Sequence, residues 1–108
     1  MQVRSKIWLE KDGKQIFGEG KSEIFKRIRK HGSINKAAKS MGISFRHAWS
    51  YITEVEKRLG KPLIERTKGG RGGGGSGLTA YAAELVEKYD KLKRAVDSFA
   101  DRKKKEIF

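Results

Sequence analysis

The sequence predicts an α+β fold in which three short helices are followed by a two-stranded hairpin and a long C-terminal helix. Three observations predict it. Apolar residues recur at helical spacing between residues 21 and 59, seven of the thirteen glycines lie between Gly69 and Gly77, and a heptad pattern of apolar residues begins at Leu78. A chain of 108 residues is long enough for one modest core, so we expect a single domain over residues 1–108.

Residues 1–20 are expected to form an N-terminal β-hairpin. Apolar and polar residues alternate imperfectly over residues 3–9, the dipeptide Asp12-Gly13 favours a tight turn, and residues 15–17 supply the returning strand. Ser22 is then expected to cap a first helix that runs to about Lys30. This helix opens a helical core over residues 21–60.

Residues 33–59 carry the pattern of a helix-turn-helix. Ser33 and Ser44 are the expected N-caps of helices over residues 34–41 and 45–59, and Gly42 suits the left-handed corner between them. The small pair Ala37-Ala38 lets the two helices cross closely. The second helix has one apolar stripe, formed by Ala48, Ile52, Val55 and Leu59. Its other face is polar and is expected to lie in a DNA major groove.

Residues 61–78 are expected to form a wing, which makes the predicted fold a winged helix-turn-helix. The glycine run brings its backbone close to a partner, and Lys68 and Arg71 are suited to phosphate or to a minor groove. A flexible linker is the alternative, although a linker is expected between two domains rather than inside one. The run also matches the formal dinucleotide pattern Gly70-x-Gly72-x-x-Gly75, but no ribose-binding acid follows at the required spacing.

Residues 79–106 are expected to form a long helix that pairs two copies of the chain. Its apolar residues are spaced alternately by four and three, which is the a/d pattern of a coiled coil. Because the stripe is longer than a core formed by residues 21–59 can cover, we expect it to be a dimer seam. The expected seam residues are Leu78, Ala82, Leu85, Tyr89, Leu92, Val96 and Phe99.

The positive charge is concentrated in the middle of the chain. Twenty-six Lys and Arg residues against 13 Asp and Glu give a net charge of +13. Residues 21–77 hold fourteen of the basic and four of the acidic residues, so +10 of the +13 lies there. A basic excess confined to one segment is typical of a nucleic-acid-binding surface, and the alternative is an ordinary solvated surface.

Other features argue against an enzyme, a metal protein and a membrane protein. The chain has no cysteine, His31 and His47 lack metal-ligand spacing, and no nucleophile–base pair is recognisable. No apolar run approaches the ~20 residues that cross a bilayer, and the N-terminus lacks the apolar region of a signal peptide. We therefore expect no cofactor, no metal and a cytoplasmic location.

Two segments of the sequence resemble known regulators. The stretch from Gly32-Ser-Ile-Asn-Lys-Ala-Ala to Gly60-Lys-Pro-Leu-Ile-Glu-Arg66 resembles the winged helix-turn-helix of LysR-type regulators. The glycine-rich residues 67–79, together with Ala48-Trp49, are more similar to the molybdate-responsive ModE-type regulators. The resemblance implies a homodimeric transcription regulator. Full-length ModE-type proteins carry C-terminal oxyanion-binding domains, so a molybdate effector would need a site or partner beyond these residues.

The predicted function is sequence-specific binding of double-stranded DNA by a homodimeric transcription regulator. The candidate DNA-binding residues are Ser33, Lys36, Ser44, Phe45, Arg46, His47, Ser50, Lys68 and Arg71. Trp49 is left open between a core residue and a DNA contact. Two alternatives remain: a sequence-tolerant architectural DNA-binding protein, and a nucleotide- or oxyanion-binding module built on the glycine loop.

Overall fold

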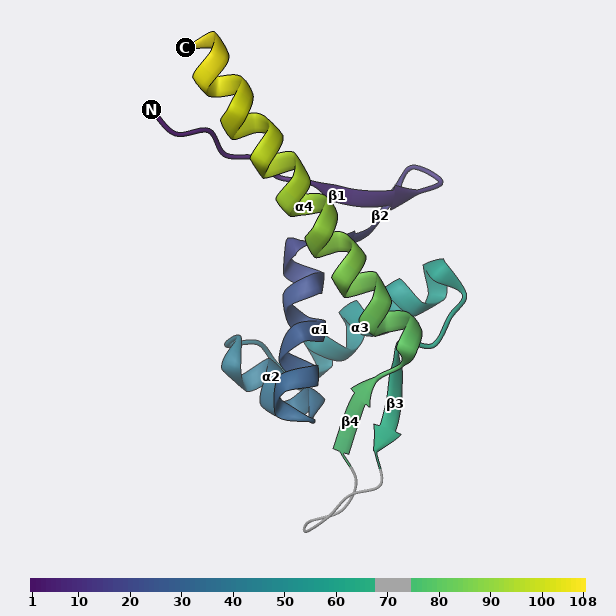
Figure 1. The fold of residues 1–108 in the computed structure, drawn as a ribbon. Helices are drawn as coiled ribbons and strands as arrows, with labels where there is room; N and C mark the ends of the chain where they lie inside the picture. Colours follow the sequence, from purple (N-terminus) through teal and green to yellow (C-terminus); the bar gives the residue numbers. More distant parts are fainter. Residues whose placement is uncertain (68–74) are drawn as a thin grey trace.

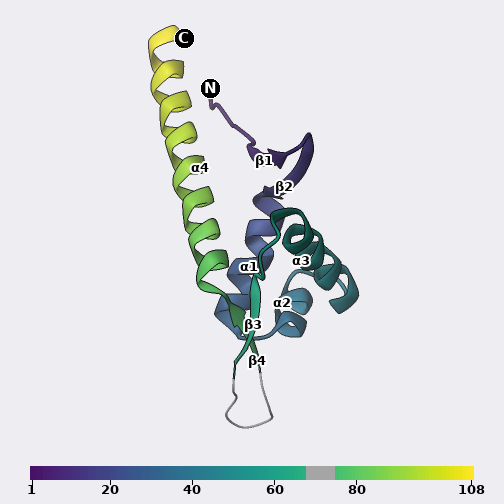
Figure 2. The same cartoon turned by 90° about the vertical axis from the view of Figure 1, so that its right-hand side faces the viewer.

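The computed structural model describes residues 1–67 and 75–108 and has the expected α+β architecture (Figure 1). The elements are β1 (Trp8–Lys11), β2 (Lys14–Gly18), α1 (Glu19–His31), α2 (Ile34–Ser40), α3 (Phe45–Leu59), β3 (Ile64–Thr67), β4 (Gly75–Leu78) and α4 (Ala80–Ile107). The strands pair antiparallel as two separate hairpins, β1–β2 and β3–β4. Both chain termini lie at one end of the molecule, and β3–β4 lies at the opposite end (Figures 1 and 2).

The N-terminal hairpin is shorter than expected. Asp12 and Gly13 form the predicted two-residue turn, with φ of 53° and 77°, so that Lys11 pairs with Lys14. Residues 1–7, however, are not part of the strand. The prediction of a hairpin over all of residues 1–20 is therefore wrong at both ends. The first strand begins only at Trp8, and α1 already begins at Glu19.

The start of α1 corrects the expected N-cap. Gly18, in extended conformation, occupies the N-cap position, and Ser22 lies inside the helix with 2% of its surface exposed. Ser22 is one turn before Phe25 and Lys26, so its face of the helix is turned inward with the apolar residues Phe25 and Ile28. A serine before an apolar run is an N-cap only where its own backbone is non-helical. Ser22 does not meet this condition, because the helix has already begun at Glu19.

The two helices of the helix-turn-helix begin and end as predicted. Ser33 Oγ accepts a hydrogen bond from Lys36 N at 3.1 Å, and Ser44 Oγ accepts one from His47 N at 3.0 Å. Between the helices Gly42 has φ of 69°, the left-handed conformation that the corner requires. These caps satisfy backbone N–H groups that a helix leaves unpaired at its first turn, and each is worth ~1 kcal/mol.

One apolar core joins the first hairpin, the three short helices and α4. The Phe17 ring stacks on Phe25, with centroids 5.9 Å apart, and meets Tyr89 of α4 edge-on at 5.3 Å. The buried apolar residues are Ile16, Phe17, Ile24, Phe25, Ile28, Ile34, Ala37, Ala38, Ala48, Ile52, Val55, Leu63, Ala82, Val86 and Tyr89. The first half of α4 is therefore part of the domain itself.

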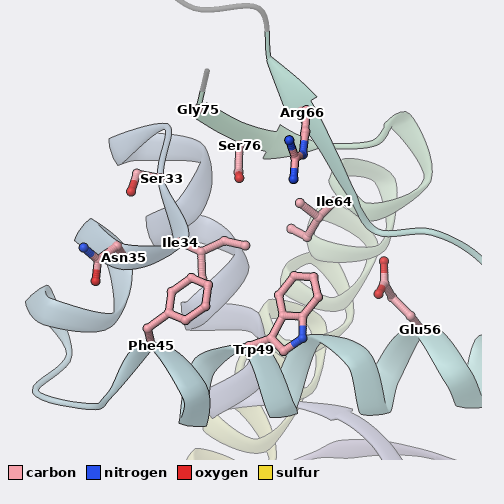
Figure 3. A pocket seen from close by; sticks show the side chains of 10 residues that line it. All are labelled: Ser33, Ile34, Asn35, Phe45, Trp49, Glu56, Ile64, Arg66, Gly75 and Ser76. Atoms are coloured by element: carbon pink, nitrogen blue, oxygen red, sulfur yellow. The ribbon is translucent and has the colours of Figure 1, made fainter. Parts of the chain in front are cut away.

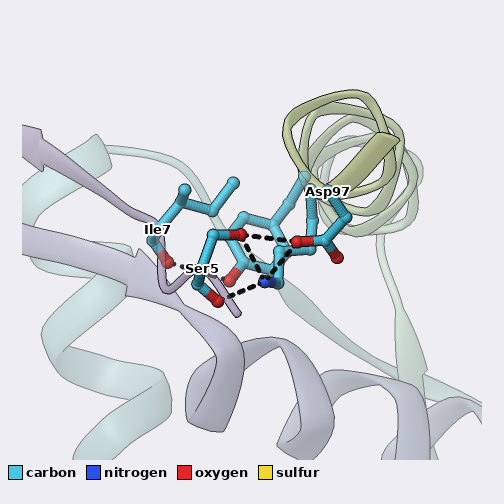
Figure 4. Close-up of polar contacts among 5 residues, drawn as sticks. Ser5, Ile7 and Asp97 are labelled. Atoms are coloured by element: carbon cyan, nitrogen blue, oxygen red, sulfur yellow. Dashed lines mark hydrogen bonds and ion pairs between the residues drawn. The ribbon is translucent and has the colours of Figure 1, made fainter. Parts of the chain in front are cut away.

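The N-terminal arm, residues 1–7, is held along α4 by polar contacts (Figure 4). The Tyr89 hydroxyl donates to Ile7 O at 3.0 Å, and Lys93 Nζ donates to Ser5 O at 2.6 Å. Ser5 Oγ donates to the Asp97 carboxylate, which also accepts from Lys93 at 3.1 Å. The Ser5 hydroxyl and the Lys93 ammonium hold the pKa of Asp97 below its ordinary value, whereas burial raises the pKa of Tyr89.

This packing corrects the expected dimer seam. The expected seam residues Ala82 and Tyr89 are only 1% and 3% exposed, because they pack inside their own chain, so they offer no surface to a second copy. The neighbouring Val86 is buried in the same way, at 1%. The heptad stripe spans two neighbouring faces of α4. One face packs on the domain, and the other leaves Leu92 and Phe99 45% and 53% exposed.

Candidate nucleic-acid interface

The N-terminal half of α3 presents polar and aromatic side chains to solvent on the side that avoids the core. Ala48, Ile52 and Val55 are fully buried on one face, while Arg46 and Ser50 are exposed on the other. The remaining predicted contacts among the described residues lie nearby. Lys36, Ser44, Phe45 and His47 are exposed, and Ser33 is half-buried. A helix with one buried and one polar face has the form that major-groove recognition requires.

Three of the four acidic side chains in residues 21–67 are already engaged. Glu54 pairs with Arg58 at 2.7 Å, and Glu23 pairs with Arg27 at 2.8 Å. Glu56 Oε2 accepts a hydrogen bond from Leu63 N at 2.8 Å, which ties the end of α3 to the segment before β3. Among the described residues, by contrast, Arg46 and Lys36 form no ion pair. The exposed face therefore carries uncompensated positive charge.

The wing, β3 and β4, is attached to the helical core through backbone contacts. Ser76 N donates to Gly32 O at 2.9 Å, which joins β4 to the residue that ends α1. A Cβ on Gly75 would lie 2.4 Å from the same carbonyl oxygen, so only glycine fits there without a shift. Thr79 adds two contacts at the base, because its N–H donates to Leu63 O and its Oγ1 to Pro62 O.

The two cations predicted for the wing, Lys68 and Arg71, lie outside the described residues. Within the described part, β3 supplies a cation that the sequence reading missed. Arg66 is exposed and faces α3 across a hollow of about 570 Å³ (Figure 3). Ile64 and Arg66 are two residues apart on a strand and therefore share a face, so the position of Arg66 beside Ile64 could have been inferred from the strand period.

Trp49, which the sequence left open, is not a core residue. Its side chain is 44% exposed and stands beside that of Phe45, which is 49% exposed. The two rings are nearly parallel, at 7°, with centroids 6.3 Å apart. Both side chains extend from α3 into the hollow between this helix and the wing (Figure 3).

The described residues contain neither a group of metal ligands nor a membrane-spanning helix. Within residues 1–67 and 75–108, no three His, Cys, Asp or Glu side chains are grouped as metal ligands would be. Across the same part of the chain, no helix combines the length and apolar character needed to span a membrane.

A capped two-helix unit, a hairpin beside it and a long closing helix define the winged helix-turn-helix class. Comparison with known proteins gives the family. The family model described as "Bacterial regulatory helix-turn-helix protein, lysR family" matches residues 21–83. The chain belongs to this family.

The chain is also similar to individual regulators. It is 44% identical to the transcriptional regulator ModE of Haemophilus influenzae over 71 residues, covering 66% of this chain and 28% of that protein. It is 35% identical to the dual regulator ModE of Escherichia coli K12 over 105 residues, covering 94% of this chain and 40% of that protein. The chain thus spans well under half the length of these relatives.

A solved structure has the same fold. The crystal structure of a complex between the CbnR DNA-binding domain and DNA superposes with a TM-score of 0.61 at 21% identity. The match covers 82% of this chain and 97% of the CbnR domain. The predicted winged helix-turn-helix with a long C-terminal helix is confirmed at the level of the fold.

Proposed function

We propose that this chain is the DNA-binding part of a transcription regulator and binds double-stranded DNA with sequence preference. The observation that carries the proposal is the exposed face of α3, where Arg46 and Ser50 stand opposite the buried stripe without an acidic partner among the described residues. Side chains in the first turns of a recognition helix are those that meet base edges. Membership of a family of regulatory helix-turn-helix proteins supports the same function.

The wing supplies the second contact of the proposed complex. Its base is fixed to α1 and to the segment before β3, so it keeps a constant place beside α3. Arg66, together with Lys68 and Arg71 from the sequence, provides cations for the phosphate backbone. Contacts of this kind position a protein on DNA and carry little sequence information.

The proposal includes a homodimer formed through an apolar strip of α4, in which Leu92 and Phe99 are exposed and Leu85 and Val96 are partly buried. The second half of α4 extends past the globular part of the molecule, with the N-terminal arm alongside it (Figures 1 and 2). Residues 78–108 hold eight basic and six acidic residues, so two copies of this segment repel each other far less than two copies of the basic middle. A dimer places two recognition helices on one palindromic site.

A finer part of the proposal concerns effectors. The chain matches relatives named as ModE over at most 40% of their length in the two comparisons above. We assign DNA binding to residues 1–108 and expect no molybdate response from them. Isothermal titration of the chain with molybdate measures this directly, and heat from a saturable site contradicts it.

The first prediction separates base contacts from phosphate contacts. Arg46→Ala is expected to reduce sequence preference and to cost about 1–3 kcal/mol on a preferred site, because Arg46 lies on the exposed face of α3. Lys68→Ala is expected to weaken binding to all sequences alike and to lower the salt dependence by about one ion. Fluorescence-anisotropy titrations on preferred and scrambled duplexes at several salt concentrations measure both effects.

The same titrations distinguish the proposal from an architectural DNA-binding protein. An architectural protein would show a steep salt dependence with nearly equal affinity for the preferred and scrambled duplexes. If Arg46→Ala and Lys68→Ala weaken both duplexes equally, Arg46 does not read base edges.

A further inference from the structure

Two large aromatic side chains remain half exposed on α3, although the core-facing apolar side chains of this helix are buried. Phe45 is 49% exposed and Trp49 44%, whereas Ala48, Ile52 and Val55 on the same helix are fully buried. At 100° per residue, Phe45 and Trp49 lie between the buried stripe and the polar face that holds Arg46 and Ser50. They therefore border the surface proposed to enter the major groove.

The two rings form one side of the hollow between α3 and the wing (Figure 3). They are almost parallel, at 7°, and one turn apart along the helix, so together they present a continuous apolar surface. Ile34 and Ile64 extend that surface toward α2 and β3, while Ser33, Asn35, Ser76 and Arg66 give the hollow a polar rim. An apolar floor with a polar, cationic rim matches a ligand that has both apolar and anionic groups.

The charge around the hollow decides between possible occupants. The described acidic residue in its lining, Glu56, is engaged with Leu63 N, whereas Arg66 lies on the rim and Arg46 and Lys36 lie on the neighbouring surface. A second copy of this chain would bring the same basic segment, with +10 over residues 21–77, against itself. A strand of DNA is complementary to this charge.

We propose that Phe45 and Trp49 recognise the 5-methyl groups of thymines in the DNA strand that passes between α3 and the wing. The thymine methyl is the apolar group that the major groove offers, and an apolar side chain beside it distinguishes thymine from cytosine. Phe45 and Trp49 lie on the side of α3 that faces the wing, where the bases of this strand border the groove. They thereby add thymine preference to the hydrogen bonds that Arg46 and Ser50 make to other bases.

This inference rests on the proposed function, since it specifies how the same surface selects its sequence. The test uses residues 1–108 and a preferred duplex, in which each thymine is replaced in turn by uracil. Uracil keeps every hydrogen-bonding group of thymine and lacks only the methyl. Affinities are measured for the unmodified protein, Trp49→Ala and Phe45→Ala, with Trp8→Ala as matched control, because Trp8 on β1 is 48% exposed and remote from α3 in sequence.

We expect one or two thymines in each half-site at which uracil lowers the affinity of the unmodified protein about threefold to fivefold, the effect of one buried methyl-sized group. Trp49→Ala or Phe45→Ala should abolish the difference between thymine and uracil at those positions, and Trp8→Ala should retain it. Circular dichroism and thermal unfolding verify that each variant is folded. Because both aromatic side chains are half exposed, one variant suffices if the other unfolds.

Two results overturn the inference. One is equal affinity of the unmodified protein for all thymine and uracil duplexes. The other is a uracil effect that persists unchanged in Trp49→Ala and Phe45→Ala. Neither result affects the proposed function, which fails instead if the unmodified protein binds the preferred and scrambled duplexes equally.

Discussion

Leu92→Asp combined with Phe99→Asp is expected to yield a folded monomer with greatly reduced affinity for a palindromic site. Both side chains are about half exposed in the single chain, at 45% and 53%, so their replacement removes little from its own core. In a dimer each buried side chain of this size contributes ~1.5–3 kcal/mol, and four carboxylates would enter the seam. Sedimentation equilibrium at micromolar concentration gives the mass, and the loss of paired half-sites should reduce DNA affinity by about 10²-fold or more.

The matched control is Lys91→Asp combined with Ser98→Asp. These two exposed residues have the same seven-residue spacing but lie away from the apolar strip of α4. The control should remain dimeric. A dimer that survives Leu92→Asp with Phe99→Asp, or an unmodified protein that sediments as a monomer, contradicts the proposed seam.

Gly75→Ala is expected to displace the wing and to weaken DNA binding while the helices stay folded. The new Cβ would lie 2.4 Å from Gly32 O, and both groups belong to the backbone, so β4 must move away from α1. That movement breaks the hydrogen bond from Ser76 N to Gly32 O. We expect a loss of ~1–3 kcal/mol in the free energy of unfolding and about tenfold or more in DNA affinity.

Gly77→Ala on the same strand is the control. Its Cβ would lie 3.2 Å from a methyl group of the Thr67 side chain, which can rotate. Urea denaturation and DNA titration of the two variants should therefore differ clearly. Equal DNA affinities for Gly75→Ala and the unmodified protein would mean that the position of the wing does not matter for binding.

The parts of the fold that the sequence predicted correctly depend on residues close together in the chain. Ser33 and Ser44 each accept a hydrogen bond from the backbone N–H three residues later, so residue type and spacing are sufficient to identify them. The Asp12-Gly13 turn is local in the same sense. Helix boundaries that depend on such caps were accordingly predicted to within a residue or two.

The features that were missed depend on contacts between distant residues. Tyr89 fits a heptad seam by spacing, yet Phe17 and the Ile7 carbonyl, more than seventy residues earlier, hold it inside the domain. The attachment of β4 to Gly32 likewise joins segments that no local pattern connects. For Trp49, the sequence pattern of the helix could not decide between burial and exposure. The exposure of this side chain depends on where the wing lies relative to α3.

The most direct test of the central claim is selection of duplexes from a random-sequence pool by the unmodified 108-residue protein. If α3 reads base edges and α4 pairs two chains, repeated selection should enrich an inverted repeat whose half-sites lie about 34 Å apart, one turn of DNA. Enrichment of a single unrepeated half-site would contradict the dimer. A pool that remains random after selection, although the protein binds it at low salt, would contradict sequence-specific recognition itself.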